Sequence, residues 1–224
     1  MKRSLINQQL RQAQALFTRH GWFLPAWAQW TVADYAAHPA EAQRLRTQQM
    51  GWDVTDFASG RFAQRGLVLF CLRNGVPHKA GERPYAEKLM MVAEGQETPL
   101  HLHRAKMEDI INRGGGHLML EFHAVDEQRQ RTAAPVTVEV DSVARVLQPG
   151  EPLRLRPGES VTVRRGVLHR FYAEPGHGVV LAGEVSQCND DHGDNYFDEP
   201  LGRFAQIDED EPVLFPLWNE VGQG

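Results

Sequence analysis

The sequence predicts a mainly β protein, in which short strands form a barrel or sandwich and α-helices precede them. Strong helical periodicity is confined almost entirely to residues 1–50. From about Gly51 onward, short apolar or alternating runs are separated by turn residues about every 8 to 12 positions. A length of 224 residues with 42 % hydrophobic side chains suits one domain with its own core. We therefore expect a single domain over residues 1–224, with residues 1–50 as a helical extension packed on the barrel.

Two helices are expected in this extension. Ser4 can cap the first, whose apolar residues recur at spacings of three and four up to Phe17, and Gly21 is expected to end it. The second is expected over residues 32–50, where Pro39 would kink or restart it.

The rest of the chain contains a series of predicted strands. Turns rich in glycine and proline separate them, for example at residues 114–116 and 157–158. The strands are expected over residues 66–72, 87–94, 98–103, 108–112, 117–125, 136–143, 160–163, 168–172 and 178–186. The tail from about residue 189 is rich in Asp, Asn, Gly and Pro, and we expect it to cover the barrel as a long loop.

Composition excludes several classes of partner. Lys and Arg number 24 and Asp and Glu number 29, so the net charge is −5, which disfavours binding to nucleic acid or to anionic lipid. The longest apolar run, residues 67–72, is far shorter than the ~20 residues of a membrane span. No apolar segment typical of a signal peptide follows Met1, and two cysteines make no disulfide framework. These features favour a cytoplasmic protein.

Two histidines at neighbouring positions on one strand face define the candidate site. Alternate residues of a strand point to the same side, so His101 and His103 share a face. Glu108 begins the next predicted strand, where a hairpin would fold it back beside them, and His169 lies on a later strand. Three imidazoles and one carboxylate suit Mn, Fe, Ni, Co or Zn and leave positions open on an octahedral ion. Open positions indicate a catalytic rather than a structural metal site.

Two segments resemble the two cupin motifs. Residues 95–108, followed by Gly115, match the first motif throughout. Residues 158–169 are similar to the second, although Arg164 stands where proline is usual and Ala173 where asparagine is usual. The resemblance implies a cupin-type β-barrel, also called a double-stranded β-helix or jelly roll. The metal ligands that it implies are His101, His103, Glu108 and His169.

A finer resemblance narrows the function. Residues 88–101, 106–116 and 183–191 resemble the D-lyxose isomerase family of bacterial cupins. This implies interconversion of D-lyxose and D-xylulose through an enediol-type proton transfer, with D-mannose and D-fructose as secondary substrates. It also implies a manganese ion, although other divalent transition metals suit the same ligands. No Gly-rich dinucleotide fingerprint is present to indicate an organic cofactor. Because cupins commonly pair, we expect a homodimer.

Isomerisation needs a base that reaches a carbon-bound proton. Glu184, on the last predicted strand, is the first candidate. Lys88 is the second, because a lone cation in an otherwise apolar strand needs a reason, and it could steer sugar oxygens or shuttle a proton. Asp190 and Asp191, directly after the strand of Glu184, are expected to bind substrate hydroxyls, as is Arg203.

The sequence leaves alternatives open. A non-haem iron cupin oxygenase would use the same four ligands with O₂ at an open position, although the polar and acidic residues beyond the ligands favour a polyol. A non-catalytic sugar-binding cupin would need no base. For single residues, Lys88 could be an edge-strand lysine facing water and Glu184 a carboxylate at the barrel rim or in a salt bridge. The acidic tail could be a solvated loop.

Overall fold

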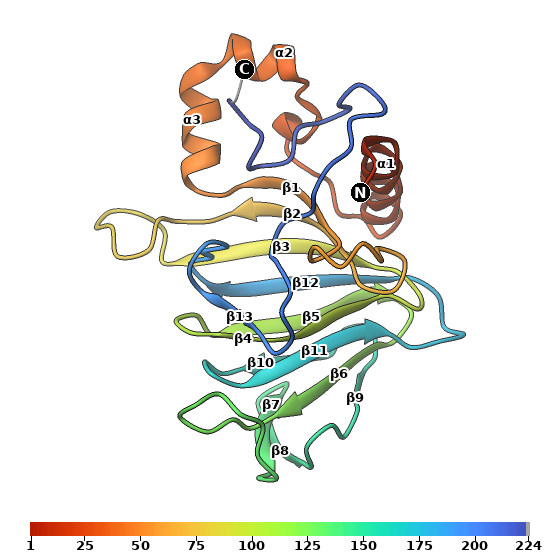
Figure 1. The fold of residues 1–224 in the computed structure, drawn as a ribbon, viewed down its shortest axis with the longest axis vertical. Coiled ribbons are helices and arrows are strands. Elements are labelled where there is room, and N and C mark those ends of the chain that lie inside the picture. The colour runs from red at the N-terminus through yellow and green to blue at the C-terminus, as the bar shows by residue number, and fades with distance from the viewer. Residues whose placement is uncertain (223–224) are drawn as a thin grey trace.

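Two antiparallel β-sheets form the body of the protein (Figure 1). The structure is a computed structural model and describes residues 1–222. The large sheet has the strand order β1-β2-β3-β12-β5-β10-β7-β8, and the small sheet has the order β13-β4-β11-β6-β9. The strands are β1 Gly51–Thr55, β2 Leu67–Arg73, β3 Tyr85–Val92, β4 Glu97–His103, β5 Glu108–Gly115, β6 Leu118–His123, β7 Val136–Val140, β8 Val143–Leu147, β9 Leu153–Leu155, β10 Ser160–Val163, β11 Leu168–Ala173, β12 Val180–Gln187 and β13 Asn195–Phe197.

The inner faces of the two sheets enclose the main hydrophobic core. Met90 and Ile110 from the large sheet belong to the same buried cluster as Phe122 and Phe171 from the small sheet. Along β5 the side chains alternate between buried and more exposed, as expected for a strand with one face on a core. The mainly β prediction is therefore confirmed.

The helices lie outside this core and only partly follow the prediction. They are α1 Arg3–Arg19, the 3₁₀ helix η1 Ala26–Gln29, α2 Val32–Ala37 and α3 Pro39–Thr47. The predicted cap is wrong: Lys2 is the N-cap of α1, and Ser4 lies inside the helix, where its hydroxyl donates to Asp210. A new helix does begin at Pro39, as expected for proline in the first turn. Among residues 1–222, no helix has the length and apolar character needed to cross a membrane.

Several strands were not anticipated. The single strand predicted over residues 136–143 is instead the hairpin β7–β8, because Asp141 and Ser142 adopt left-handed backbone angles (φ 48° and 67°) and turn the chain. β1 and β9 were missed as well. The tail is not entirely loop, because β13 pairs with β4 and places Asn195 opposite His103. The tail therefore becomes part of the sheet that carries the candidate ligands.

A second buried cluster joins the helical region to the outer face of the large sheet. Ile6 and Leu10 of α1 pack with Val68 and Phe70 of β2. Figure 1 shows α2, α3 and the C-terminal segment gathered at the β1 end of this sheet, with the β7–β8 hairpin at the opposite end. We keep residues 1–224 as the proposed single domain with residues 1–50 as its extension. The last two of these residues lie outside the described part of the chain.

Candidate active site

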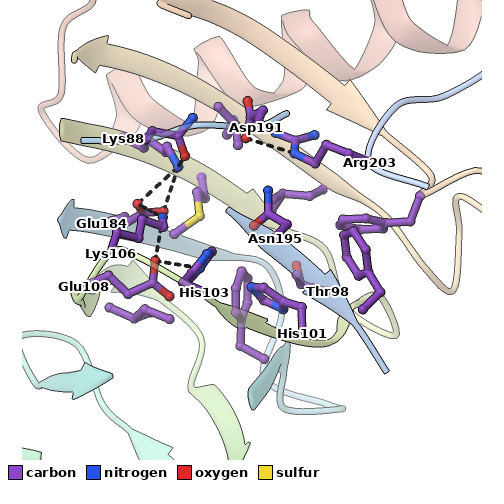
Figure 2. Close-up of a pocket in the computed structure, with 18 residues that line it drawn as sticks. Lys88, Thr98, His101, His103, Lys106, Glu108, Glu184, Asp191, Asn195 and Arg203 are labelled. Carbon is purple, nitrogen blue, oxygen red and sulfur yellow. Dashed lines mark hydrogen bonds and ion pairs between the residues drawn. The ribbon is translucent and has the colours of Figure 1, made fainter. Parts of the chain in front are cut away.

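A cavity lies between the two sheets, beside the strands that carry the predicted ligands (Figure 2). It encloses about 470 Å³ of space, including its open mouth. Its wall combines apolar side chains, such as Phe57 and Phe197, with charged ones, such as Lys88, Glu184 and Arg203. Because these residues come from both sheets and from the tail, the cavity depends on the complete fold.

The four predicted metal ligands meet at this cavity. His101 and His103 lie on β4, and the pairing of β11 with β4 sets His169 opposite His101. Glu108 begins β5 in the other sheet, so the link from β4 crosses between sheets and is not the hairpin that the sequence predicted. All four side chains are buried, and their candidate ligand atoms lie within 4.8 Å of one another.

Contacts at the ring nitrogen Nδ1 orient the imidazoles of His101 and His169. His101 and His169 each place Nδ1 beside the backbone carbonyl oxygen two residues earlier, at 2.8 and 3.1 Å. His103 Nδ1 lies 3.4 Å from Asp194 Oδ2, within ion-pair distance but without a hydrogen bond. Metal-binding histidines characteristically occupy one ring nitrogen in this way, which fixes the ring and leaves the other nitrogen for the ion. In His101 and His169, Nε2 is the nitrogen left for coordination.

The chemistry of this group fits a divalent metal ion. Glu108 Oε2 lies 3.2 Å from His103 Nε2, and Glu108 Oε1 lies 3.0 Å from His169 Nε2. His169 Nε2 is nevertheless buried without a hydrogen bond from the described residues. Burial, reinforced by the neighbouring histidines, lowers the pKa of His101 well below its usual value, so this ring is neutral and can coordinate. An orphaned imidazole nitrogen beside a carboxylate is the donor set that a transition metal requires.

Lys106, which sequence reasoning did not single out, links this group to Glu184. Its Nζ lies 2.8 Å from Glu108 Oε2 and donates to Glu184 Oε1 at 2.6 Å. Although burial opposes the charge, both carboxylates raise the pKa of Lys106, so it is an ammonium. Burial likewise opposes ionisation of Glu108, but its neighbours His103 and Lys106 hold its pKa well below the usual value. One cation thus separates two ionised carboxylates.

Glu184 and Lys88 face each other across β12 and β3. Lys88 Nζ lies 3.1 Å from both oxygens of Glu184 and donates to Asn189 Oδ1 at 2.7 Å. β3 lies between β2 and β12 and Lys88 is 5 % exposed, so it is not an edge-strand lysine facing water. Burial would raise the pKa of Glu184, but the charges of Lys106 and Lys88 lower it, so the carboxylate is ionised.

Of the two aspartates predicted to bind substrate, only one lines the cavity. Asp191 lines the cavity and accepts from Arg203 Nε at 3.1 Å. Burial opposes its ionisation, but Arg203 and Lys88 lower the pKa of Asp191 to about 2. Arg203 also contacts Asp53, a residue that the sequence did not single out. Asp190 lies outside the cavity, and its Oδ1 accepts from the backbone of His192 at 3.1 Å.

A second group of possible ligands lies at the surface. Glu174 Oε2 lies 2.6 Å from His117 Nδ1 and 3.6 Å from His177 Nε2. The other oxygen of Glu174 is bound to Arg154. Because a cation already neutralises this carboxylate, the group is best described as a surface ion-pair network.

Comparison with known proteins agrees with this arrangement. A sequence profile of the family described as D-lyxose isomerase matches residues 1–221. The chain belongs to the D-lyxose isomerase family. A D-lyxose/D-mannose isomerase of Escherichia coli O157:H7 is 44 % identical over 232 residues, covering 100 % of this chain and 99 % of that protein. Another, from Serratia proteamaculans, is 44 % identical over 222 residues, covering 98 % of this chain and 97 % of that protein. Members of the family named in this way are sugar isomerases, and this chain is an enzyme of that class.

Solved structures show the same fold. The L-ribose isomerase of Cellulomonas parahominis, solved with L-ribose, aligns with a TM-score of 0.62 at 18 % identity, covering 93 % of this chain and 98 % of that one. The L-ribose isomerase of Acinetobacter sp. DL28 aligns with a TM-score of 0.60 at 15 % identity, covering 92 % of this chain and 98 % of that one. The predicted cupin-type barrel is confirmed by this likeness.

Sequence reasoning did not identify several residues that line the cavity of this D-lyxose isomerase family member or lie beside it. Lys106 carried a usable signal, since it lies two positions before Glu108 within the first cupin motif. Asp194 and Asn195 lie in the tail that was expected to be loop, and Thr98 lies one step out of alternation with the histidines. For these three residues the sequence pattern gives no signal.

Proposed function

We propose that the protein interconverts D-lyxose and D-xylulose, and D-mannose and D-fructose as a second pair, by an enediol-type proton transfer between C1 and C2. The observation that carries the proposal is the buried group of three imidazoles and one carboxylate with ionised Glu184 beside it in one cavity. The names of the two relatives support the choice of sugars. D-Lyxose and D-mannose share their configuration at C2, C3 and C4, so one site can treat their reacting ends alike.

The residues proposed to hold the metal are His101, His103, Glu108 and His169. When bound there, a divalent ion would polarise the sugar carbonyl and stabilise the negative charge that develops on the reacting oxygens. We propose Mn²⁺, which mixed imidazole and carboxylate ligands accommodate. Asp194 would hold the ring of His103 in its coordinating orientation.

Glu184 is the proposed base. It would take the proton from C2 of the aldose and return it to C1 of the product. Its two oxygens are not equivalent: Oε1 accepts from Lys106 at 2.6 Å, Ser186 Oγ at 2.8 Å and Lys88 at 3.1 Å, whereas Oε2 accepts from Lys88 alone. Oε2 is therefore the oxygen with room for the substrate proton, and the contacts to Oε1 hold the carboxylate in place.

Lys88 is proposed to steer the sugar oxygens and stays the second candidate for proton transfer. Its ammonium is buried beside Glu184, where it can donate to a substrate oxygen without moving far. Asp191 and Arg203 are proposed to bind hydroxyls of the remaining carbons, and their mutual ion pair holds both side chains at the cavity wall. Asp190 would act on the sugar only if its side chain turned, because it now lies outside.

The homodimer is also part of the proposal. β8 is an edge strand of the large sheet, and Val143 and Val146 on it are each 63 % exposed. An exposed apolar edge strand is a surface that proteins generally cover. Light scattering should give twice the mass of the chain. The cytoplasm stays the proposed compartment, supported by the two unpaired cysteines.

The direct test incubates manganese-loaded protein with a panel of aldoses in the absence of O₂ and measures ketose. We expect D-xylulose from D-lyxose and D-fructose from D-mannose, with no product after the metal is removed. A cupin oxygenase would be silent without O₂, and a binding protein would leave every aldose unchanged. Absence of ketose from both sugars under these conditions contradicts the proposal.

A further inference from the structure

A buried hydroxyl in the cavity wall has no partner. Thr98 is 3 % exposed, and its Oγ1 makes no hydrogen bond to any of the described residues. The same side chain lines the cavity (Figure 2). A buried hydroxyl without a partner is unfavourable, whereas one that meets a ligand hydroxyl can both donate and accept. A residue of the cavity wall therefore carries a polar group that the protein does not satisfy.

An irregularity in β4 directs Thr98 into the cavity. Strict alternation would put Thr98 and His101 on opposite faces of the strand. β11 pairs His169 with His101 and Phe171 with Thr98, so three steps along β4 match two steps along β11. This bulge turns Thr98 to the face that carries the histidines. Pro99 has no N–H to give to a sheet ladder, which suits it to this position.

The bulge also fixes Thr98 relative to the metal ligands. The carbonyl oxygen of Pro99, the residue after Thr98, lies 2.8 Å from His101 Nδ1. The same short segment therefore sets both the ring of His101 and the hydroxyl of Thr98. A hydroxyl held at a constant offset from the ligands is placed to recognise a constant position along a substrate bound to them.

The two sides of the cavity differ in chemistry. Figure 2 shows Thr98 and Asn195 on the same side as His101, and Lys88 with Glu184 on the other side. The side chain of Asn195 also lines the cavity and forms no hydrogen bond within residues 1–222. The side away from the proposed base thus offers hydrogen-bonding groups that the protein itself does not satisfy.

We propose that Thr98 Oγ1 binds a hydroxyl of the sugar beyond C2 and makes the enzyme selective for polyols that carry it. The inference rests on the proposed function, since it takes the occupant to be an open-chain sugar. Thr98 would act by hydrogen bonding to substrate and would take no part in proton transfer. Asn195 is placed to complete the same subsite.

The test measures binding of D-arabinitol, the unreactive polyol obtained by reducing D-lyxose, to the manganese-loaded protein by calorimetry. Thr98→Val keeps the shape and removes the hydroxyl, and it should weaken binding about 3- to 10-fold, the range of one neutral hydrogen bond. Thr98→Ser should bind within about 2-fold of the wild type. Thr137→Val, the same change at an exposed position of β7, is the matched control and should bind unchanged.

The unfolding temperature and the kinetic constants of Thr98→Val distinguish substrate binding by Thr98 from a role in folding. Because Thr98 Oγ1 has no partner in the protein, Thr98→Val should unfold at the same temperature as the wild type or higher when no polyol is present. With D-lyxose, the variant should raise KM by the same factor as the binding loss and leave kcat within about 2-fold. A lower unfolding temperature that Thr98→Ser restores would assign the hydroxyl to folding and overturn the inference.

Two failures can be told apart. If the wild type converts D-lyxose but Thr98→Val binds D-arabinitol as tightly as the wild type, the role of Thr98 is wrong and the proposed function stands. If the wild type converts no aldose but Thr98→Val still weakens D-arabinitol binding, the subsite stands and the proposed function fails. Absence of D-arabinitol binding to the wild type also overturns the subsite.

Discussion

Two regions of this protein bury a cation between two carboxylates, and both line a cavity, but only one of them lies beside the proposed metal ligands. Near the chain ends, Arg3 lies between Glu209 and Glu220, with Nη2 at 2.6 and 2.5 Å from their oxygens. In the cavity wall, Lys106 lies between Glu108 and Glu184 at 2.8 and 2.6 Å. Each cluster consists of one cation and two carboxylates. Their geometry and surroundings must therefore account for the different roles proposed for them.

The surroundings of the carboxylates distinguish the two clusters. Both cations are almost fully buried, but Glu209 is 56 % and Glu220 is 25 % exposed, whereas Glu108 is 3 % and Glu184 is 7 % exposed. The planar guanidinium of Arg3 binds Glu209 through two nitrogens and clamps the N-terminal helix to the C-terminal segment. Lys106 offers a compact charge that keeps two buried carboxylates ionised beside the cavity. A buried cation alone therefore does not indicate catalysis.

The largest expected effect is the loss of turnover when Glu184, the proposed base beside Lys106, is substituted. Glu184→Gln preserves the shape and removes the basicity, so turnover should fall roughly 10²–10⁴-fold while metal content and sugar binding remain. Initial rates with D-lyxose, together with elemental analysis, measure this. The matched variant in the other cluster, Glu220→Gln, should keep its turnover. If Glu184→Gln retains near-wild-type turnover, Lys88 becomes the next candidate for the base.

The next largest effect is the loss of stability when the cation of either cluster is removed. Lys106→Met leaves two buried carboxylates without their cation, so the free energy of unfolding should fall by about 3–5 kcal/mol. Arg3→Met leaves carboxylates that can turn to water, so the loss should be smaller, about 1–2 kcal/mol, with turnover of the folded protein unchanged. Urea unfolding at neutral pH measures both. Equal losses would show that exposure of the carboxylates does not set the cost.

A smaller effect concerns pH. The folded-state pKa of Asp191 is about 2, below its ordinary value of 3.8, so its ionisation stabilises the fold above pH 3.8 and this stabilisation is lost as pH falls toward 2. Asp191→Asn should therefore lower the free energy of unfolding by about 2 kcal/mol at neutral pH, and the difference from the wild type should shrink as pH falls below about 4. Urea unfolding as a function of pH measures this difference.

The control for the pH effect comes from the terminal cluster. Arg3 also lowers the pKa of Glu209, but that carboxylate is mostly exposed. Glu209→Gln should therefore show the same direction of pH dependence with a smaller amplitude, because water screens the pair. A larger amplitude at Glu209 than at Asp191 would contradict the comparison.

The sequence predicted the site where its signal was local. His101 and His103 are two positions apart, and the cupin motifs supplied Glu108 and His169, so the sequence alone sufficed to predict that these four side chains meet. Contacts between distant segments gave no such signal: Arg203 meets Asp53 from 150 positions away.

Local pattern also fails where a strand is irregular. Alternation places Thr98 away from the histidines, and only the pairing of β4 with β11 shows the bulge that reverses this. Nor can adjacency decide which of two neighbouring aspartates faces the cavity, since that depends on how the tail docks. Asp191 lines the cavity, whereas Asp190 does not.

The measurement that tests the account most directly follows turnover as metal-free protein is titrated with Mn²⁺. The rate of ketose formation from D-lyxose should rise in proportion to bound metal and stop rising at one ion per chain. His101→Ala should bind the ion poorly and show little turnover at the same total metal. Full turnover by the metal-free wild type, or full metal content in His101→Ala, would contradict the assignment of this cavity as a metal-dependent isomerase site.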